Sequence, residues 1–245
     1  IDHTSKLTDI RSSKDNLNYV FTTGRRDEKT DINENPETVG FASSDSGKTW
    51  TKVTVENTDT LRTNDMNIFL IEDKVYTLSS NARIHRYNFS NNTIDLYNTT
   101  LNNLTTTSIY VKKFENNDHG ILISGVNVIY YTNIDSNFTT LTNIPNISTT
   151  ISNIVSSDGY DDKVYFVGNG IQMVNYSSYT PVLENLIQSG QYTTVSAYSA
   201  NNAVVGGINT IMYTVNGGAS WNTSSNIIIN NIIITEYTIK RICML

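Results

Sequence analysis

Ser43-Ser-Asp-Ser-Gly-Lys-Thr-Trp50 is the stretch of this 245-residue chain that says most about its architecture. A side chain such as that of Asp45 accepts hydrogen bonds from nearby backbone N–H groups and so holds a tight turn. Gly47 can adopt the left-handed backbone conformation that such a turn requires. The stretch therefore predicts a polar hairpin between two strands, and we expect the indole of Trp50 to pack into the core.

The same spacing recurs near the other end of the chain, at Thr214-Val-Asn-Gly-Gly-Ala-Ser-Trp221. Here Asn216 takes the place of the aspartate, Gly218 supplies the left-handed position, and Trp221 is the second of the two tryptophans. Weaker copies remain at residues 88–93, 132–138 and 175–179. The hairpin is therefore a recurring feature, and we expect its role to be structural rather than catalytic.

Around these hairpins the chain repeats a unit of about 42 residues, a period typical of propellers. Each unit holds four short runs rich in β-forming residues, separated by polar turns, and no segment keeps a helical period. The second runs are continuously apolar, as in Gly120-Ile-Leu-Ile-Ser-Gly125, which predicts strands buried on both faces. The units lie at residues 7–56, 65–100, 106–143, 150–185 and 191–226.

This repeat predicts an all-β fold, a single β-propeller domain over residues 1–245 built from five four-stranded antiparallel blades. Residues 230–245 read as one or two further strands. They either close the ring by pairing with the first unit or begin a sixth blade, so that six blades are the alternative. Closure is expected because a propeller leaves only short, protected strand edges.

The hairpin at residues 43–50 matches the pattern S-x-D-x-G-x-T-W in full and resembles the Asp box, or bacterial neuraminidase repeat, of sialidase-like β-propellers. The resemblance implies structural roles for eight residues, which are Ser43, Asp45, Gly47, Trp50, Thr214, Asn216, Gly218 and Trp221. In the families that it resembles, these boxes lie at the blade periphery on the face away from the ligand. Ligand binding is then expected on the opposite face.

The turn between the second and third runs of the first unit, at residues 25–37, is the longest of its kind. Long loops in compact repeats are usually functional or disordered. One interpretation is a solvated loop of mixed charge; the other is a contact loop over the binding face. The second interpretation makes Arg25, Arg26, Arg62 and Arg83 candidate ligand-binding residues.

Catalysis is not expected. The sialidase mechanism that the resemblance would imply needs three arginines on a carboxylate, a Tyr–Glu nucleophile pair and an acid/base aspartate. Glu236 and Tyr237 are adjacent in the sequence, so in a strand they point to opposite faces. The acidic turn at Asp158, Asp161 and Asp162 fails the EF-hand spacing and is expected to be an ordinary hairpin turn rather than a calcium site.

The formal net charge is −6, and no basic stripe is present. Nucleic acid and anionic membranes are therefore not expected partners, and no segment is apolar enough to insert into a bilayer. The single cysteine and the three scattered histidines predict neither a metal site nor another cofactor.

A non-enzymatic binding or structural module is therefore expected, recognising a protein or a glycan through polar and tyrosine side chains. The Asn- and Ile-rich composition is typical of AT-rich genomes, including those of many phages, and Asp-box propellers occur in virion fibres and spikes. A virion or cell-surface attachment domain within a larger assembly is the interpretation by analogy. A sialidase-like glycoside hydrolase and a cytoplasmic assembly scaffold are the alternatives.

Overall fold

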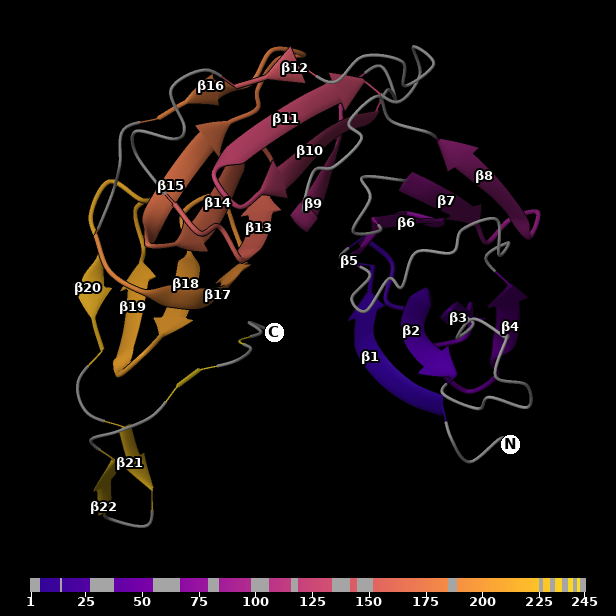
Figure 1. Ribbon diagram of the computed structural model, residues 1–245, viewed down its shortest axis with the longest axis horizontal. Helices are drawn as coiled ribbons and strands as arrows, with labels where there is room; N and C mark the ends of the chain where they lie inside the picture. Colours follow the sequence, from indigo (N-terminus) through magenta and orange to yellow (C-terminus); the bar gives the residue numbers. More distant parts are fainter. Residues whose placement is uncertain are drawn as a thin grey trace, which may run out of the picture.

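A computed structural model describes most of the chain, and it is all β (Figure 1). The described residues are 5–13, 15–26, 38–54, 67–78, 84–97, 106–115, 119–133, 142–144, 152–184, 189–224, 227–229, 232–234, 238–239 and 242. No helix occurs among them, and so none that could cross a membrane.

Five four-stranded sheets account for twenty of the strands, and each sheet is an antiparallel meander in chain order. Sheet 1 holds β1 (Ser5–Ser12), β2 (Val20–Arg26), β3 (Thr38–Ser43) and β4 (Thr51–Thr54). Sheet 2 holds β5 (Asn67–Ile71), β6 (Lys74–Leu78), β7 (Ile84–Asn88) and β8 (Thr93–Tyr97). Sheet 3 holds β9 (Thr106–Lys113), β10 (His119–Gly125), β11 (Val128–Asn133) and β12 (Thr142–Asn143).

Sheets 4 and 5 continue the same pattern. Sheet 4 holds β13 (Ser156–Tyr160), β14 (Lys163–Gly168), β15 (Gly170–Asn175) and β16 (Val182–Leu183). Sheet 5 holds β17 (Tyr192–Ala197), β18 (Ala203–Gly207), β19 (Thr210–Thr214) and β20 (Asn222–Thr223). The all-β, antiparallel architecture predicted from the repeat is confirmed.

The second strands of sheets 3 and 4 are the most deeply buried elements. Every residue of β10 is buried, and in β14 only Lys163 is partly exposed. Continuous apolar runs produce this pattern because a strand that packs between two other sheets has no solvent-facing side. The burial predicted from the run at Gly120–Gly125 is therefore confirmed.

Consecutive sheets pack through their first strands. β1 contacts β5, β5 contacts β9, β9 contacts β13, and β13 contacts β17. Four clusters of buried side chains fill the junctions between the five sheets, for example Phe21, Ala42 and Val75 between sheets 1 and 2. The sheets therefore fan around a common axis, with β4, β8, β12, β16 and β20 at the periphery (Figure 1).

This fan is an arc with sheets 1 and 5 at its ends (Figure 1). We call the side of a sheet that faces the sheet before it in the chain its preceding side, and the side that faces the next sheet its following side. Sheets 2 to 5 pack on a sheet through their preceding sides, and sheets 1 to 4 do so through their following sides. Turns between first and second strands share one face of the molecule with turns between third and fourth strands. We call this face the hairpin face.

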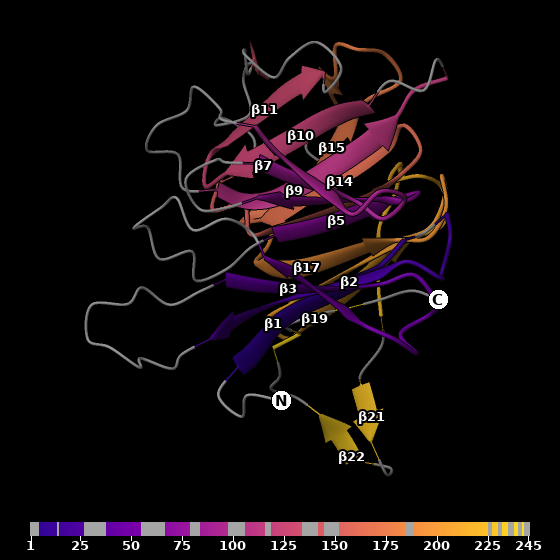
Figure 2. The ribbon, with the colours of Figure 1, turned by 90° about the vertical axis from the view of Figure 1, so that its right-hand side faces the viewer.

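Residues 227–245 follow sheet 5. β21 (Ile227–Ile229) pairs with β22 (Ile232–Ile234) in a separate two-stranded sheet, which projects away from the arc (Figure 2). Further on, Thr238 forms a bridge with Ile208, at the end of β18. The sequence left two roles for this segment, pairing with the first unit or beginning a sixth blade. Thr238, Ile239 and Ile242 of this segment contact sheet 5.

Candidate functional site

The hairpin between β3 and β4 is held by the side chain of Asp45. One carboxylate oxygen of Asp45 accepts a hydrogen bond from the backbone N–H of Thr49 at 2.8 Å, and the other accepts one from the Thr49 hydroxyl at 2.7 Å. The hydroxyl of Ser43 donates to Asp45 at 2.8 Å and accepts from the N–H of Gly47 at 2.9 Å. The bonds from Thr49, followed by that from Ser43, lower the pKa of Asp45 to about 2.

The hairpin between β19 and β20 repeats this arrangement with a neutral side chain. The amide oxygen of Asn216 accepts from the N–H of Ser220 at 3.0 Å and from the hydroxyl of Thr214 at 2.9 Å. The N–H of Gly218 donates to the Thr214 hydroxyl at 2.9 Å. Gly47 and Gly218 both have positive φ, at 84° and 88°. The six residues that hold the two turns are therefore Ser43, Asp45, Gly47, Thr214, Asn216 and Gly218.

The two tryptophans differ, and the expectation that both pack into the core was wrong for Trp50. Trp50 is 41% exposed, and its indole N–H donates to the carbonyl of Gly47 at 2.9 Å. Trp221 is partly buried and packs edge-on against Tyr165 of sheet 4, with ring centroids 5.7 Å apart. The reason is position: Trp221 lies on the preceding side of sheet 5 and faces sheet 4, whereas no sheet of the described residues packs on that side of sheet 1.

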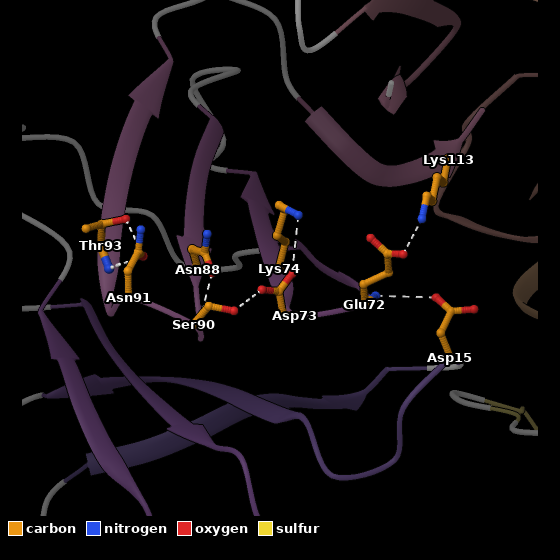
Figure 3. Close-up of polar contacts among 9 residues, drawn as sticks. All are labelled: Asp15, Glu72, Asp73, Lys74, Asn88, Ser90, Asn91, Thr93 and Lys113. Carbon is orange, nitrogen blue, oxygen red and sulfur yellow. Dashed lines mark hydrogen bonds and ion pairs between the residues drawn. The ribbon is translucent and has the colours of Figure 1, made fainter. Parts of the chain in front are cut away.

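The hairpin of sheet 2 closes with asparagines. Asn88 accepts from the N–H of Ser90 at 2.9 Å, and Asn91 accepts from the N–H of Thr93 at 3.1 Å (Figure 3). The hydroxyl of Ser90 also donates to Asp73, which pairs with Lys74 at 3.2 Å. The weaker copy of the motif at residues 88–93 thus keeps side-chain-to-backbone bonds without an aspartate or a tryptophan.

Charged side chains on the hairpin face connect neighbouring sheets. The N–H of Glu72, in the β5–β6 turn, donates to Asp15 of the β1–β2 turn at 3.3 Å, and the Glu72 carboxylate pairs with Lys113 of β9 (Figure 3). These bonds tie sheets 1, 2 and 3 together. The carboxylates and ammonium groups drawn in Figure 3 are thus used in structural contacts.

The same face connects sheets 3, 4 and 5. Lys112 of β9 pairs with Asp162, and burial lowers the pKa of Lys112. Asp158 accepts the N–H of Ala197 at 2.9 Å. Asp158 thus lies within β13 and Asp162 in the turn that follows it, and their carboxylates bind different neighbouring sheets. Among the described residues, no group of three His, Cys, Asp or Glu side chains could hold a metal ion.

Two exposed tyrosines and an exposed valine lie on turns at the hairpin face of sheets 4 and 5. Tyr160, at the end of β13, is 43% exposed, and Tyr198, just after the neighbouring strand β17, is 53% exposed. Val215, in the third hairpin turn of sheet 5, is 61% exposed. We call these three side chains the tyrosine surface.

The backbone beneath the tyrosine surface is firmly held. The Asp158–Ala197 bond fixes the ends of β13 and β17 beside each other. The N–H of Gly217 donates to the carbonyl of Asn201 at 2.9 Å, and the Lys163 ammonium donates to the carbonyl of Gly217 at 3.4 Å. Three turns from two sheets are thereby joined, so little conformational entropy would be lost on binding a partner there.

The sequence did not single out Tyr160, Tyr198 or Val215, although its fifteen tyrosines were expected to supply contact surface. The available signal was a tyrosine at the end of a first run, directly before a polar turn, in two consecutive units. The side chains of the four predicted ligand residues lie outside the described part of the structure. Arg25 and Arg26 end β2, where only the backbone is described, and Arg62, Arg83 and the loop at residues 27–37 lie outside the described residues.

Comparison with known proteins supports the fold. No family model matches the sequence, and no curated protein matches it. Among solved structures, the chain is similar to the GH74 enzyme of Niastella koreensis, with a TM-score of 0.64, 14% identity, and coverage of 89% of this chain but only 38% of that one. The chain thus spans well under half of that enzyme.

Two structures of YCF48 are matched over more of their length. YCF48 from Cyanidioschyzon merolae has a TM-score of 0.54 and 14% identity, covering 90% of this chain and 85% of that one. YCF48 bound to D1 peptide has a TM-score of 0.55 and 11% identity, covering 90% and 82%. These proteins are β-propellers, and the chain therefore has a propeller-like fold.

Proposed function

We propose that this protein is a non-enzymatic binding module that recognises a polypeptide partner. The observation that carries the proposal is the tyrosine surface, in which Tyr160, Tyr198 and Val215 stand exposed on turns that hydrogen bonds hold in place. Tyrosine is enriched where proteins meet because its ring supplies contact area and its hydroxyl a hydrogen bond, at a cost of few rotatable bonds.

The similarity to YCF48 supports a polypeptide over a glycan. One of the matched structures is of YCF48 bound to D1 peptide, and the match covers 82% of that chain. The match to the GH74 enzyme covers only 38% of that chain, so it carries less weight for this protein's function. An assembly scaffold and a virion or cell-surface attachment domain are both compatible with polypeptide binding, and they remain predictions.

We further propose that the five sheets are the five blades of a propeller and that the hairpins at residues 43–50 and 214–221 are Asp boxes. The hydrogen bonds of Asp45 and Asn216, repeated in sheets 1 and 5, support the second assignment. The consecutive packing of the first strands around one axis supports the first assignment. In this proposal residues 238–242 occupy the place of a sixth blade.

The proposal is tested by binding of the labelled full chain to an array of random dodecapeptides and to an array of sialylated and neutral glycans. We expect a sequence-dependent set of peptides to bind. The double variant Tyr160→Ala/Tyr198→Ala should lose most of this binding. Tyr213→Ala is the control, because Tyr213 is a 39% exposed tyrosine within strand β19 rather than on one of the three turns, and this variant should bind as the wild type does.

The other outcomes are informative. Binding to glycans alone would overturn the polypeptide proposal in favour of a carbohydrate-binding role. An equal loss of peptide binding in the Tyr213→Ala control would show that the tyrosine surface is not the binding site. Turnover of a fluorogenic sialoside by the wild type would overturn the non-enzymatic assignment.

A further inference from the structure

The following side of sheet 5 is occupied by a short segment of the chain's own C-terminal part. Thr238 bridges to Ile208, and the N–H of Ile239 donates to the carbonyl of Gly207 at 3.2 Å. Three residues later, the N–H of Ile242 donates to the hydroxyl of Thr194 at 3.2 Å. Thr238, Ile239 and Ile242 therefore contact sheet 5 through their backbone groups. We call these three residues the strap.

A glycine makes room for the strap. A Cβ atom on Gly206 would lie 2.5 Å from Cγ2 of Ile239 and 2.7 Å from its Cβ, distances that real contacts do not reach. The Ile239 side chain thus fills the space that any other residue at position 206 would need. The site is shaped for a side chain that branches at Cβ, because both close contacts are to the branch point of Ile239 and an atom attached to it.

An irregularity in β17 provides a polar contact at the same place. The pairing of β17 with β18 shifts between Tyr192 and Thr194, so Thr193 is an extra, bulged residue. Its hydroxyl contacts the carbonyl of Ile239 and also lies 3.2 Å from the carbonyl of Gly206. The bulge therefore aims a hydroxyl donor at the carbonyl of Ile239, and the Thr194 hydroxyl accepts the N–H of Ile242.

The location explains why such a site is available. In sheets 1 to 4, the following side packs on the next sheet through apolar side chains. On this side of sheet 5 the inner strands present Val204 beside Thr194, Ser196 and Gly206, so three of these four residues are small or carry a hydroxyl. Small and hydroxyl-bearing residues pair better with peptide backbone than with the apolar face of another sheet.

We propose that Thr193, Thr194, Gly206 and Gly207 form an acceptor site for an extended peptide with a β-branched apolar residue, and that Thr238–Ile242 is its resident, displaceable ligand. The recognised chemistry is one backbone N–H and one carbonyl at the branched residue and a second N–H three residues on. The site lies on sheet 5 away from the tyrosine surface and does not depend on the function proposed for that surface.

The test uses the full chain and a fluorescein-labelled peptide of residues 235–242, Thr-Glu-Tyr-Thr-Ile-Lys-Arg-Ile. Ile239→Asp places a carboxylate against Gly206 and should release the strap. This variant should bind the peptide roughly tenfold or more tightly than the wild type, in which the strap competes, as measured by fluorescence anisotropy. A peptide carrying the Ile239→Asp change should not bind. Ile239→Asp/Gly206→Val should bind neither peptide.

Equal peptide binding by Ile239→Asp and Ile239→Asp/Gly206→Val would overturn the proposal, and so would no binding to a folded Ile239→Asp protein. If Ile239→Asp does not fold, hydrogen exchange decides the question. The amides of Ile239 and Ile242 should be protected in the wild type, and Thr194→Val should release Ile242 while Ile239 stays protected. Unprotected amides at both positions in the wild type would also overturn the proposal.

Discussion

Residues at matching positions of the two hairpins form the same hydrogen bond with different chemical groups. Asp45 and Asn216 each accept a backbone N–H four residues on, at 2.8 and 3.0 Å, although only Asp45 is charged. A neutral amide is therefore sufficient for the hairpin, and the charge of Asp45 adds a dependence on pH. The two positions provide a comparison within one molecule.

Asp45→Asn should keep the hairpin, whereas Asp45→Ala should lower the melting temperature because the N–H and hydroxyl of Thr49 lose their acceptor. The pKa of Asp45 is about 2 in the folded chain against 3.8 for an ordinary aspartate. The unfolded chain therefore binds the proton first as pH falls, and the stabilisation is present above pH 4 and lost between pH 4 and 2.

Thermal unfolding of both variants between pH 2 and 6 checks this. The melting temperature of the wild type relative to Asp45→Asn should decline over that interval, since the amide does not titrate. A difference that stays constant with pH would show that the carboxylate's charge does not matter.

The two tryptophans should report their different surroundings. Trp221→Phe leaves Trp50, which is 41% exposed, so its fluorescence should be red-shifted and readily quenched by iodide. Trp50→Phe leaves Trp221, packed on Tyr165, which should emit at shorter wavelength and be less accessible to iodide. Equal iodide quenching of the two variants would contradict the placement of Trp50.

At the scale of elements, the junctions between sheets depend on close approach as well as on apolar area. Gly120 of β10 lies against sheet 4, where a Cβ would come within 2.1 Å of the Tyr176 hydroxyl and 2.8 Å of Phe114. Phe114 and Tyr176 meet edge-on, with centroids 5.3 Å apart. The glycine that opens this apolar run is therefore a packing requirement, which the run itself does not reveal.

Gly120→Ala should destabilise the fold by about 1–3 kcal/mol through overpacking. Adding Tyr176→Phe removes the hydroxyl that the new methyl group meets, so the double variant should recover part of the loss. The coupling should be on the order of 1 kcal/mol, measured by urea unfolding of the four members of the cycle. Additive effects would indicate that Tyr176 does not contact position 120.

At the scale of the whole molecule, the position of a sheet in the arc decides its stability. Among the described residues, sheets 2, 3 and 4 pack on a sheet on both sides, sheet 1 packs on a sheet on its following side, and the strap lies on the following side of sheet 5. Opening should therefore begin at the ends of the arc, because fewer apolar contacts are lost there.

Hydrogen exchange should show this gradient. Amides of β10 and β14, whose residues are almost all buried, should exchange most slowly. Amides of β3 and β19, in the two end sheets, should exchange faster, and Gly206→Val should speed exchange in sheet 5 more than in sheet 1. Uniform protection across the five sheets would contradict a gradient along the arc.

Much of the architecture could be predicted from local pattern. The period of about 42 residues, the continuous apolar second runs and the Asp45 and Asn216 hairpins depend on neighbours within a few residues in the chain. The antiparallel sheets follow from such contacts, because a meander joins each strand to the next through a short turn. For the same reason, the hydrogen bonds of the two hairpins could be expected before any packing was known.

Only the tertiary structure decided which copies of a feature lie in the interior and which lie at an end. Trp50 and Trp221 have matching motifs, yet only Trp221 has a sheet to pack against. Tyr160 and Tyr198 are 38 residues apart in the sequence and come to the same face of the molecule only because β13 and β17 lie side by side. The strap and Gly206 likewise meet because the arc leaves one side of sheet 5 without a neighbouring sheet, and burial of that kind is a property of the assembled sheets rather than of any segment.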